Sequence, residues 1–243
     1  MATVAIYSLK GGVGKTTLAV NLAWTAAAQS ARRTLLWDLD PQAAASWILY
    51  DDRPENRRRD RAQAVFSRDV SPAKLVRPTA WPGLDLLPAD ASLRGLDHLL
   101  RDLDKKKRLG RLLDDLDHDR VLLDCPPGLT DTAEQVMRAA DLVVIPVVPS
   151  ALSARAYQEV VDHLRGRTPI LPVHSMVDRR RRLHAEALRA EPDWPVIPMA
   201  SDAEAAAAAR APLGAISPRS AAAQSFSTLW RAIEARLAQG LET

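Results

Sequence analysis

The sequence contains very little cysteine and no long apolar run. Its one cysteine, Cys125, excludes a disulfide within the chain and supplies no set of thiolates for a metal site. The longest apolar stretch, residues 142–148, falls far short of the roughly 20 residues that a membrane-spanning helix needs. The first residues also lack the charged and apolar regions of a signal peptide. These absences favour a cytoplasmic location.

The net charge is low as well, at +3 for 243 residues. Hydrophobic residues make up 47% and charged residues 26%, which is ordinary for a globular protein with a substantial core. The basic residues are unevenly spread, with clusters at 57–59, 105–108 and 179–182. Such clusters suit a polyanionic partner, although most charged runs are solvated faces of helices and loops. The composition therefore leaves nucleic-acid binding open without establishing it.

Expected strands alternate with expected helices along the whole chain. Short β-branched or apolar runs are followed by segments with a helical spacing of leucine and alanine. The expected strands are residues 3–7, 33–39, 84–88, 121–123, 141–148, 169–173 and 195–198, and the longer expected helices are 18–28, 92–116, 153–164, 180–190 and 222–237. This alternation predicts an α/β fold, a doubly wound and mainly parallel sheet flanked by helices, in one domain of residues 1–243.

A glycine-rich loop stands between the first expected strand and the first expected helix. It comprises Lys10, Gly11, Gly12, Val13, Gly14, Lys15, Thr16 and Thr17. The spacing fits the phosphate-binding pattern G-x-x-x-x-G-K-[ST], except that Leu9 occupies the first glycine position. Because a strand, a glycine loop and a helix in this order are the setting that the pattern requires, we interpret the segment as a nucleotide-binding P-loop.

Each residue type in this loop has a part in binding a nucleoside triphosphate. The three glycines allow positive φ angles and leave room for the backbone to approach a phosphate. Amide groups at the start of the following helix then surround that phosphate. Lys15 is expected to contact the β- and γ-phosphates, and the Thr16 hydroxyl is expected to bind Mg²⁺.

Three aspartates follow strands that we expect to end at the same edge of the sheet. Asp38 and Asp40 follow the second strand, and Asp124 ends the strand at 121–123. Ligands of open α/β sheets bind at the carboxyl ends of the strands. An aspartate that ends a strand downstream of a P-loop can contact Mg²⁺, often through water. Together with the loop, these residues predict a site for ATP and Mg²⁺.

Several short motifs occur in a fixed order along the chain. They are K-G-G-x-G-K-[ST] at 10–16, D-x-D-P-Q at 38–42, D-x-P-P at 124–127, a strand with its proline loop at 145–150 and a short segment at 176–179. In combination they resemble the ParA/MinD family of ATPases, whose P-loop carries the extra lysine. The resemblance extends from residue 2 to about residue 235 and is to the small ParA proteins without an N-terminal helix-turn-helix.

The resemblance implies roles for the charged residues of the site. Lys10 would reach across an ATP-sandwich homodimer to the phosphates bound by the other subunit, and would act with Lys15 in catalysis. Asp40 would position the hydrolytic water. Asp38 would support the Mg²⁺ shell, to which Thr16 and Asp124 also belong.

The resemblance also implies where the base and DNA would bind. The residues expected beside the adenine base are Met176, Asp178 and Pro198. Many chromosomal ParA proteins continue the last strand with I-P-R, but this chain has Met199 in place of the arginine, so that DNA contact is not carried over. The arginines expected to face DNA are instead Arg179, Arg180, Arg182, Arg210 and Arg219.

The function that this resemblance implies is an ATP-driven positioning switch. ATP would close a dimer, and the dimer would bind DNA of the nucleoid without sequence specificity. A ParB-like or other adaptor protein would then stimulate hydrolysis and release. The cargo stays open at this point, because a plasmid, a chromosome and a protein assembly would all fit.

Two other functions remain open on the same scaffold. MinD-like proteins cycle on membranes through a C-terminal amphipathic helix, and this chain has an apolar stripe of Phe226, Leu229, Trp230, Ile233 and Leu237. Such a stripe more often packs on a sheet than on lipid, so we expect no stable membrane association. An iron–sulfur relative would need two cysteines per subunit, and a metabolic ligase would need a substrate pocket that sequence cannot show.

Overall fold

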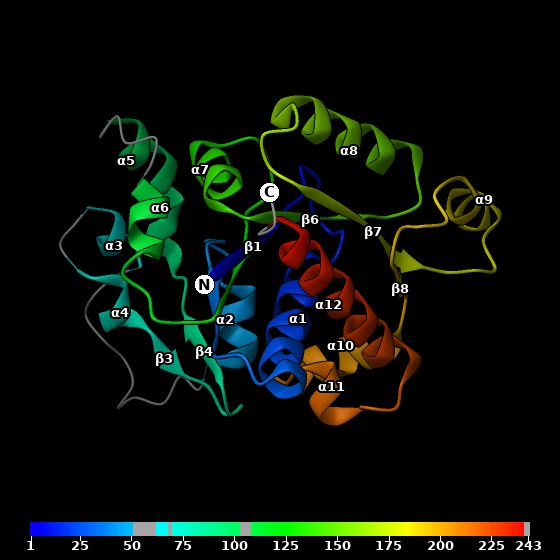
Figure 1. The fold of residues 1–243 in the computed structure, drawn as a ribbon, viewed down its shortest axis with the longest axis horizontal. Coiled ribbons are helices and arrows are strands. Elements are labelled where there is room, and N and C mark those ends of the chain that lie inside the picture. Colours follow the sequence, from blue (N-terminus) through cyan, green and yellow to red (C-terminus); the bar gives the residue numbers. More distant parts are fainter. Residues whose placement is uncertain (51–61, 68–69, 103–107, 241–243) are drawn as a thin grey trace.

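A computed structural model describes residues 1–50, 62–67, 70–102 and 108–240, which fold around one twisted sheet (Figure 1). In these residues the sheet has eight strands in the order β3-β4-β2-β5-β1-β6-β7-β8. All neighbouring strands pair in parallel except β3 and β4, which are antiparallel. The strands are β1 (Ala2–Ile6), β2 (Thr34–Asp38), β3 (Arg77–Pro78), β4 (Leu84–Leu87), β5 (Arg120–Asp124), β6 (Leu142–Val147), β7 (Ile170–Val177) and β8 (Val196–Pro198). The predicted fold class is confirmed.

Helices cover both faces of the sheet. One face carries α1 (Lys15–Ser30), α2 (Ala44–Leu49), α10 (Ser201–Ala208), α11 (Leu213–Ile216) and α12 (Ala221–Gly240). The other carries α3 (Ala64–Ser67), α4 (Pro72–Leu75), the 3₁₀ turn η2 (Ala91–Gly95), α5 (Leu96–Asp102), α6 (Arg108–Leu113), α7 (Asp131–Ala139) and α8 (Ala151–Leu164). The remaining helix, α9 (Arg182–Ala190), stands beyond β7 and β8 at one end of the molecule (Figure 1).

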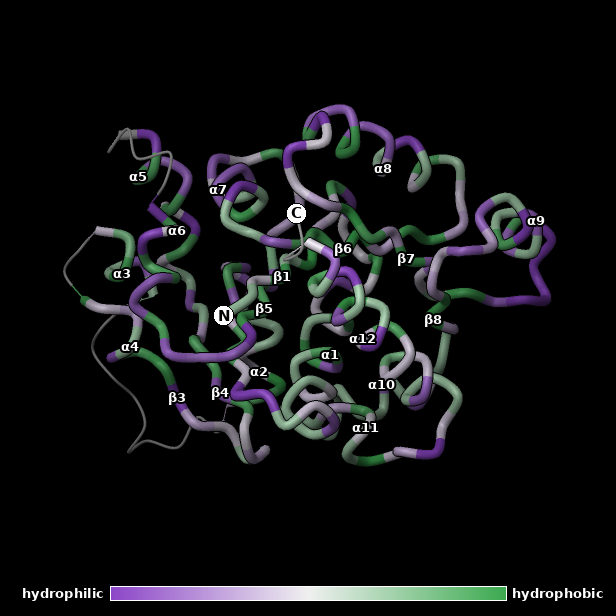
Figure 2. The backbone as a smooth tube through the Cα atoms, viewed as in Figure 1, coloured by the Kyte–Doolittle hydropathy of each residue, from purple (hydrophilic) through white to green (hydrophobic). Residues whose placement is uncertain are grey.

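Each face of the sheet buries its own hydrophobic core. Side chains alternate along a strand, so Val4 and Leu36 pack into one core while Ala5 and Leu35 pack into the other. The central strands are therefore apolar on both faces, as in other sheets that helices cover on both sides. Figure 2 shows these hydrophobic strands at the centre and a strongly hydrophilic segment around the start of α9.

The apolar stripe of the last helix is buried against the sheet. Phe226, Leu229, Trp230, Ile233 and Leu237 all lie inside the first core. The Trp230 indole donates a 2.7 Å hydrogen bond to the Ser30 hydroxyl at the end of α1. Arg120 holds the same helix through a paired contact with Glu234, at 2.7 and 2.8 Å. This burial leaves the stripe unavailable to lipid in the folded chain. Across the described residues, none of the helices has the length and apolar character of a membrane span.

The structure differs from the sequence prediction in several elements. The single helix expected at 92–116 is divided into η2, α5 and α6, and the lysines at 105–107 lie outside the described residues. The elements β3, α3, α7 and α11 were not predicted, and β7 extends to Val177, beyond the expected end at residue 173. The Thr130 side chain caps α7 by accepting a hydrogen bond from the Ala133 amide. This threonine is a local signal for the start of a helix, but the first turn of α7 is polar, so the helix was not recognised. Helix α9 begins at Arg182 rather than at residue 180.

The packing of α11 against α1 depends on a glycine. A Cβ added at Gly214 would overlap the ring of Trp24, which would have to move. We expect Gly214→Ala to lower the free energy of unfolding by about 1–3 kcal/mol, the usual cost of overpacking. In α6, nothing lies within 4 Å of a Cβ added at Gly110. There we expect the same substitution to be neutral or to stabilise by up to about 1 kcal/mol.

Urea denaturation of the two glycine variants measures this difference directly. The two substitutions remove the same backbone freedom from the unfolded chain, so their difference reports the steric clash alone. Equal midpoints for Gly214→Ala and Gly110→Ala would contradict the close packing of α11 on α1.

Candidate functional site

The site is built where three central strands end together. The register of the sheet pairs Asp124, at the end of β5, with Ile6 of β1 on one side and with Asp38 of β2 on the other. The segments that follow these strands therefore leave the sheet from one edge. This arrangement brings the glycine-rich loop and the acidic motifs together, although they lie far apart in the sequence.

The glycine-rich loop adopts the backbone that its composition predicts. Gly12 has a φ of 71° and Gly14 a φ of 88°, in the left-handed region that glycine tolerates best. Helix α1 begins at the next residue, and no side chain of the described residues caps it. Its first amides are therefore directed toward the loop with no side-chain acceptor, which is the arrangement that binds a phosphate.

Two contacts hold this loop in place. The ammonium of Lys15 donates a 3.2 Å hydrogen bond to the carbonyl oxygen of Lys10. On the other side, the Ser175 hydroxyl at the end of β7 donates to the Val13 carbonyl at 2.8 Å. Lys15 is buried, and burial lowers its pKa, while Asp124, Cys125 and Asp40 raise it. The lysine thus lies in an acidic site, close to where a phosphate would be held.

Asp124 is the most unusual group in the site. It is fully buried, and neither of its carboxylate oxygens makes a hydrogen bond within the described residues. Burial raises the pKa of this carboxyl well above its usual range, and the nearby Asp38 adds to that rise. Thr16 and Lys15 act in the opposite direction. The Asp124 carboxylate is thus buried without a hydrogen bond in the described part of the chain, next to the Thr16 hydroxyl. Oxygen atoms of this kind are the hard ligands that Mg²⁺ prefers.

Asp38 lies beside Asp124, but both of its carboxylate oxygens accept hydrogen bonds from the protein. One carboxylate oxygen accepts from the Asp40 amide at 3.1 Å, and the other accepts from the amide and hydroxyl of Ser46 at 2.9 and 2.7 Å. Burial raises the pKa of Asp38 to about 6, against these hydrogen bonds, which lower it. The Ser46 hydroxyl also accepts from the Ala89 amide at 2.8 Å. Asp38 therefore fixes the turn that carries Asp40. The sequence did not reveal the contact between Asp38 and Ser46.

A cavity of about 470 Å³ opens next to the loop. Its volume is within the usual range for small-molecule sites. The predicted residues that line it are Gly11, Gly12, Gly14, Lys15, Thr16, Thr17, Asp40, Met176 and Pro198. Sequence reasoning did not select the remaining lining residues, which are Leu18, Pro127, Ser175, Ile197, Met199, Ala200, Ala203, Glu204, Ala207, Ala222 and Phe226. Five of these eleven residues come from α10 and α12, where alanines carry no signal that distinguishes a cavity wall from a core.

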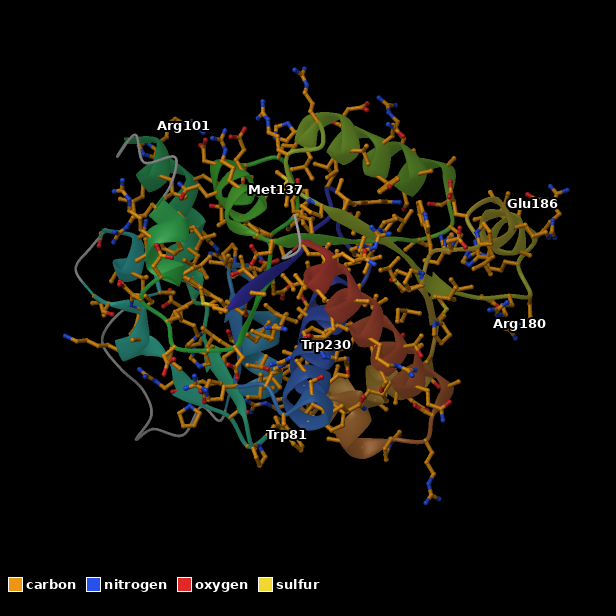
Figure 3. All side chains as sticks on the ribbon, viewed as in Figure 1. Trp81, Arg101, Met137, Arg180, Glu186 and Trp230 are labelled. Carbon is orange, nitrogen blue, oxygen red and sulfur yellow. The ribbon has the colours of Figure 1, made fainter. Side chains whose placement is uncertain are left out.

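Asp178 does not line this cavity. Its carboxylate accepts hydrogen bonds of 2.9 and 3.1 Å from the Arg180 guanidinium, which lowers the pKa of Asp178 to about 2. Figure 3 shows Arg180 at the outer margin of the molecule, before α9 and away from the central sheet. The structure thus places Met176 and Pro198 at the cavity but directs Asp178 toward the turn that precedes α9.

The arginines expected to face DNA differ in their exposure and in the hydrogen bonds and ion pairs that they make. Arg210 donates to the carbonyls of Trp47 and Tyr50 at the end of α2, and its guanidinium lies 5.5 Å from the centre of the Trp47 ring. Arg182 has an ion pair with Glu186 at 3.6 Å. Arg179 and Arg219 are exposed, whereas the arginines at 57–59 lie outside the described residues.

Comparisons with known proteins agree with the motifs. A family model described as an AAA domain matches residues 1–166. The chromosome partitioning protein ParA of Caulobacter vibrioides is 34% identical over 204 residues, which cover 78% of this chain and 74% of that protein. The sporulation initiation inhibitor protein Soj of Bacillus subtilis is 32% identical over 168 residues, covering 67% of this chain and 64% of Soj.

Solved structures show the same fold. An ATP complex of McdA from Cyanothece superposes with a TM-score of 0.81 at 22% identity, covering 96% of each chain. The cell division ATPase MinD of Pyrococcus furiosus gives 0.77 at 23% identity, covering 99% of this chain and 98% of MinD. With the loop, the acidic strand ends and these relatives in agreement, the chain belongs to the ParA family of P-loop ATPases.

Proposed function

We propose that this protein is a Mg²⁺-dependent ATPase that dimerises on ATP and positions a cargo through non-specific binding to DNA. The observation that carries the proposal is the buried, unpartnered carboxylate of Asp124 beside a glycine loop that bears Lys15 and Thr16. The names of the relatives support a partitioning or positioning role, since they include a chromosome partitioning protein and a cell division ATPase.

Phosphate binding rests on the loop and on the first turn of α1. The uncapped amides of that turn and the Lys15 ammonium supply positive charge where the β- and γ-phosphates would lie. Lys15 makes its hydrogen bond to the Lys10 carbonyl, which a phosphate oxygen can replace. The same contact therefore keeps the lysine in position before nucleotide binds.

The residues that would hold Mg²⁺ are Thr16 and Asp124. Bound there, the ion would neutralise charge that develops on the phosphate oxygens during hydrolysis. Few protein ligands are needed, because Mg²⁺ keeps several waters and also binds phosphate oxygens. Asp38 is assigned a supporting part: it orients the turn at residues 39–46 through Asp40 and Ser46.

Asp40 is the residue proposed to orient the attacking water. It lines the cavity, and one of its oxygens accepts a 2.8 Å hydrogen bond from the Gln42 amide. The second oxygen has no hydrogen bond within the described residues and is available to a water molecule. Fixed by Asp38 beneath it, Asp40 would hold that water in line with the γ-phosphate without itself binding the metal.

A second copy of the chain is the proposed partner at this edge. The Lys10 ammonium makes no hydrogen bond or ion pair within the described residues, although the residue is half-buried. Leu129 follows β5 and Leu152 follows β6, the two strands on either side of β1, and these leucines are also exposed, by 43% and 67%. An unpaired lysine with nearby apolar side chains suits an interface that closes over the phosphates of the other subunit.

DNA binding is proposed to use the exposed arginines. The side chains of Arg180 and Arg182 are 90% and 86% exposed, so their ion pairs are weak and can be exchanged for phosphates. Arg179 and Arg219 complete the proposed surface. Arg210 contributes less, because its donors are already used by the carbonyls of α2. A ParB-like or other adaptor protein would stimulate hydrolysis and release the dimer from the nucleoid.

Replacing Lys15 tests the phosphate site. We expect Lys15→Gln to weaken ATP binding by roughly 10- to 100-fold, because one charge-assisted hydrogen bond to phosphate contributes about 1.5–3 kcal/mol. Titration with a fluorescent ATP analogue measures the affinity. Lys74→Gln on α4, which lies outside the cavity, is the matched control. Unchanged affinity in Lys15→Gln would remove the P-loop assignment.

Replacing Lys10 separates binding from dimerisation. Because its ammonium has no partner within the described residues, we expect Lys10→Ala to bind ATP within about threefold of the wild type but to remain monomeric. Light scattering in ATP and Mg²⁺ gives the molecular mass. Mixing this variant with Lys15→Gln subunits tests whether Lys10 acts on the other subunit. A Lys10→Ala protein that dimerises as the wild type does would contradict this role.

DNA binding is tested by mobility shifts with two unrelated duplexes, each in ATP and in ADP. We expect the protein to bind both duplexes equally with ATP and neither duplex with ADP. The affinity with ATP should fall between roughly 50 and 200 mM salt. A double substitution, Arg179→Ala with Arg219→Ala, should weaken binding to both. Arg33→Ala, which removes an exposed arginine outside the proposed surface that is paired with Asp117, is the control for the loss of a positive charge elsewhere. Equal binding in ATP and ADP would refute the switch, and a preference for one duplex would refute the non-specific mode.

A further inference from the structure

The part of the cavity that lies away from the phosphate loop is an apolar slot. Ala203 and Ala207 of α10 line it, and so do Ala222 and Phe226 of α12. Residues four apart lie on one face of a helix, so each helix presents a matched pair of side chains to the slot. Three of these four side chains are methyl groups, so the two helices present small apolar walls to the cavity. Pro198 and Met199 line it from the end of β8.

One ionisable side chain among the described residues lines this apolar part, namely Glu204 on α10. The other ionisable lining residues, Lys15 and Asp40, belong to the glycine loop and the turn after β2. Glu204 is exposed, and its carboxylate makes no hydrogen bond or ion pair within the described residues. The slot therefore combines apolar walls with one free carboxylate, a composition typical of a site that orients a ligand by a few polar contacts.

We propose that Glu204 selects the base of the nucleotide, by accepting a hydrogen bond from the 6-amino group of adenine. This inference rests on the proposed function, because the triphosphate must occupy the glycine loop for the base to reach the slot. It adds a specificity-determining residue, on a helix that none of the motifs includes.

The selection follows from the hydrogen-bonding capacity of a carboxylate. An ionised glutamate only accepts hydrogen bonds. Adenine carries an amino donor at position 6, whereas hypoxanthine and guanine carry an oxygen there. In hypoxanthine or guanine, the oxygen at position 6 would face the carboxylate oxygens of Glu204, and their lone pairs would repel each other. The same carboxylate therefore favours adenine and disfavours the 6-oxo purines. A glutamine at this position could either donate or accept, and would lose the discrimination.

Competition binding tests the inference. A fluorescent ATP analogue bound to the full chain is displaced by unlabelled ATP, ITP or GTP, and the three affinities are compared. ITP differs from ATP at position 6 and lacks the 2-amino group of GTP, so it isolates the contact. We expect Glu204→Gln to reduce the preference for ATP over ITP by about tenfold, the order expected for one charge-assisted hydrogen bond at a partly exposed site. Part of that change must come from tighter binding of ITP.

The matched control is Asp202→Asn, which removes a carboxylate from the same helix outside the cavity. Its ATP to ITP ratio should equal that of the wild type. Tighter ITP binding cannot arise from damage to the fold, so this readout separates selection from a structural effect. An unchanged ratio in Glu204→Gln, or an equal loss for ATP and ITP, would overturn the role of Glu204 while leaving the ATPase intact. A wild-type chain that binds none of the nucleotides would overturn the proposed function itself.

Discussion

The candidate site is organised around the buried carboxylate of Asp124. Transfer of an ionised carboxylate out of water is costly unless a cation or hydrogen bonds compensate for it. Asp124 ends the central strand β5 with neither oxygen hydrogen-bonded in the described residues, and Asp38 beside it adds repulsion. Lys15 offsets this only in part. The Mg²⁺ ion that we propose to bind there would complete the compensation, so we expect the site to gain stability when metal and nucleotide bind together.

Much of this site could be predicted from the sequence, because its residues obey local rules. The glycines at 12 and 14 take the positive φ angles that their loop requires. Asp38 and Asp124 end neighbouring strands, as an apolar run followed by aspartate indicates. The burial of the last helix was also predictable from its stripe of apolar residues. Each of these signals lies within a few residues of the structure that it specifies.

Other features depend on contacts between distant segments and left no local signal. The hydrogen bonds from Ser46 to Asp38 join a strand end to a helix, and only the folded chain brings Ala89 to the same hydroxyl. Arg210 was grouped with the DNA-facing arginines, but its guanidinium reaches the carbonyls of α2. The wall of the cavity formed by α10 consists mostly of alanine, which patterns of hydrophobicity do not distinguish from ordinary helix surface.

The central claim is that ATP binding causes dimerisation and that hydrolysis returns the protein to monomers. Asp40 is proposed to act in hydrolysis but not in dimerisation, so replacing it separates the two steps. Asp40→Asn keeps an acceptor for the Gln42 amide but loses the charge that would orient water. The decisive measurement is molecular mass in ATP and Mg²⁺, followed over time. The account predicts that the wild type returns to monomer as ATP is consumed, whereas Asp40→Asn stays dimeric. A protein that remains monomeric with ATP in both forms would contradict it.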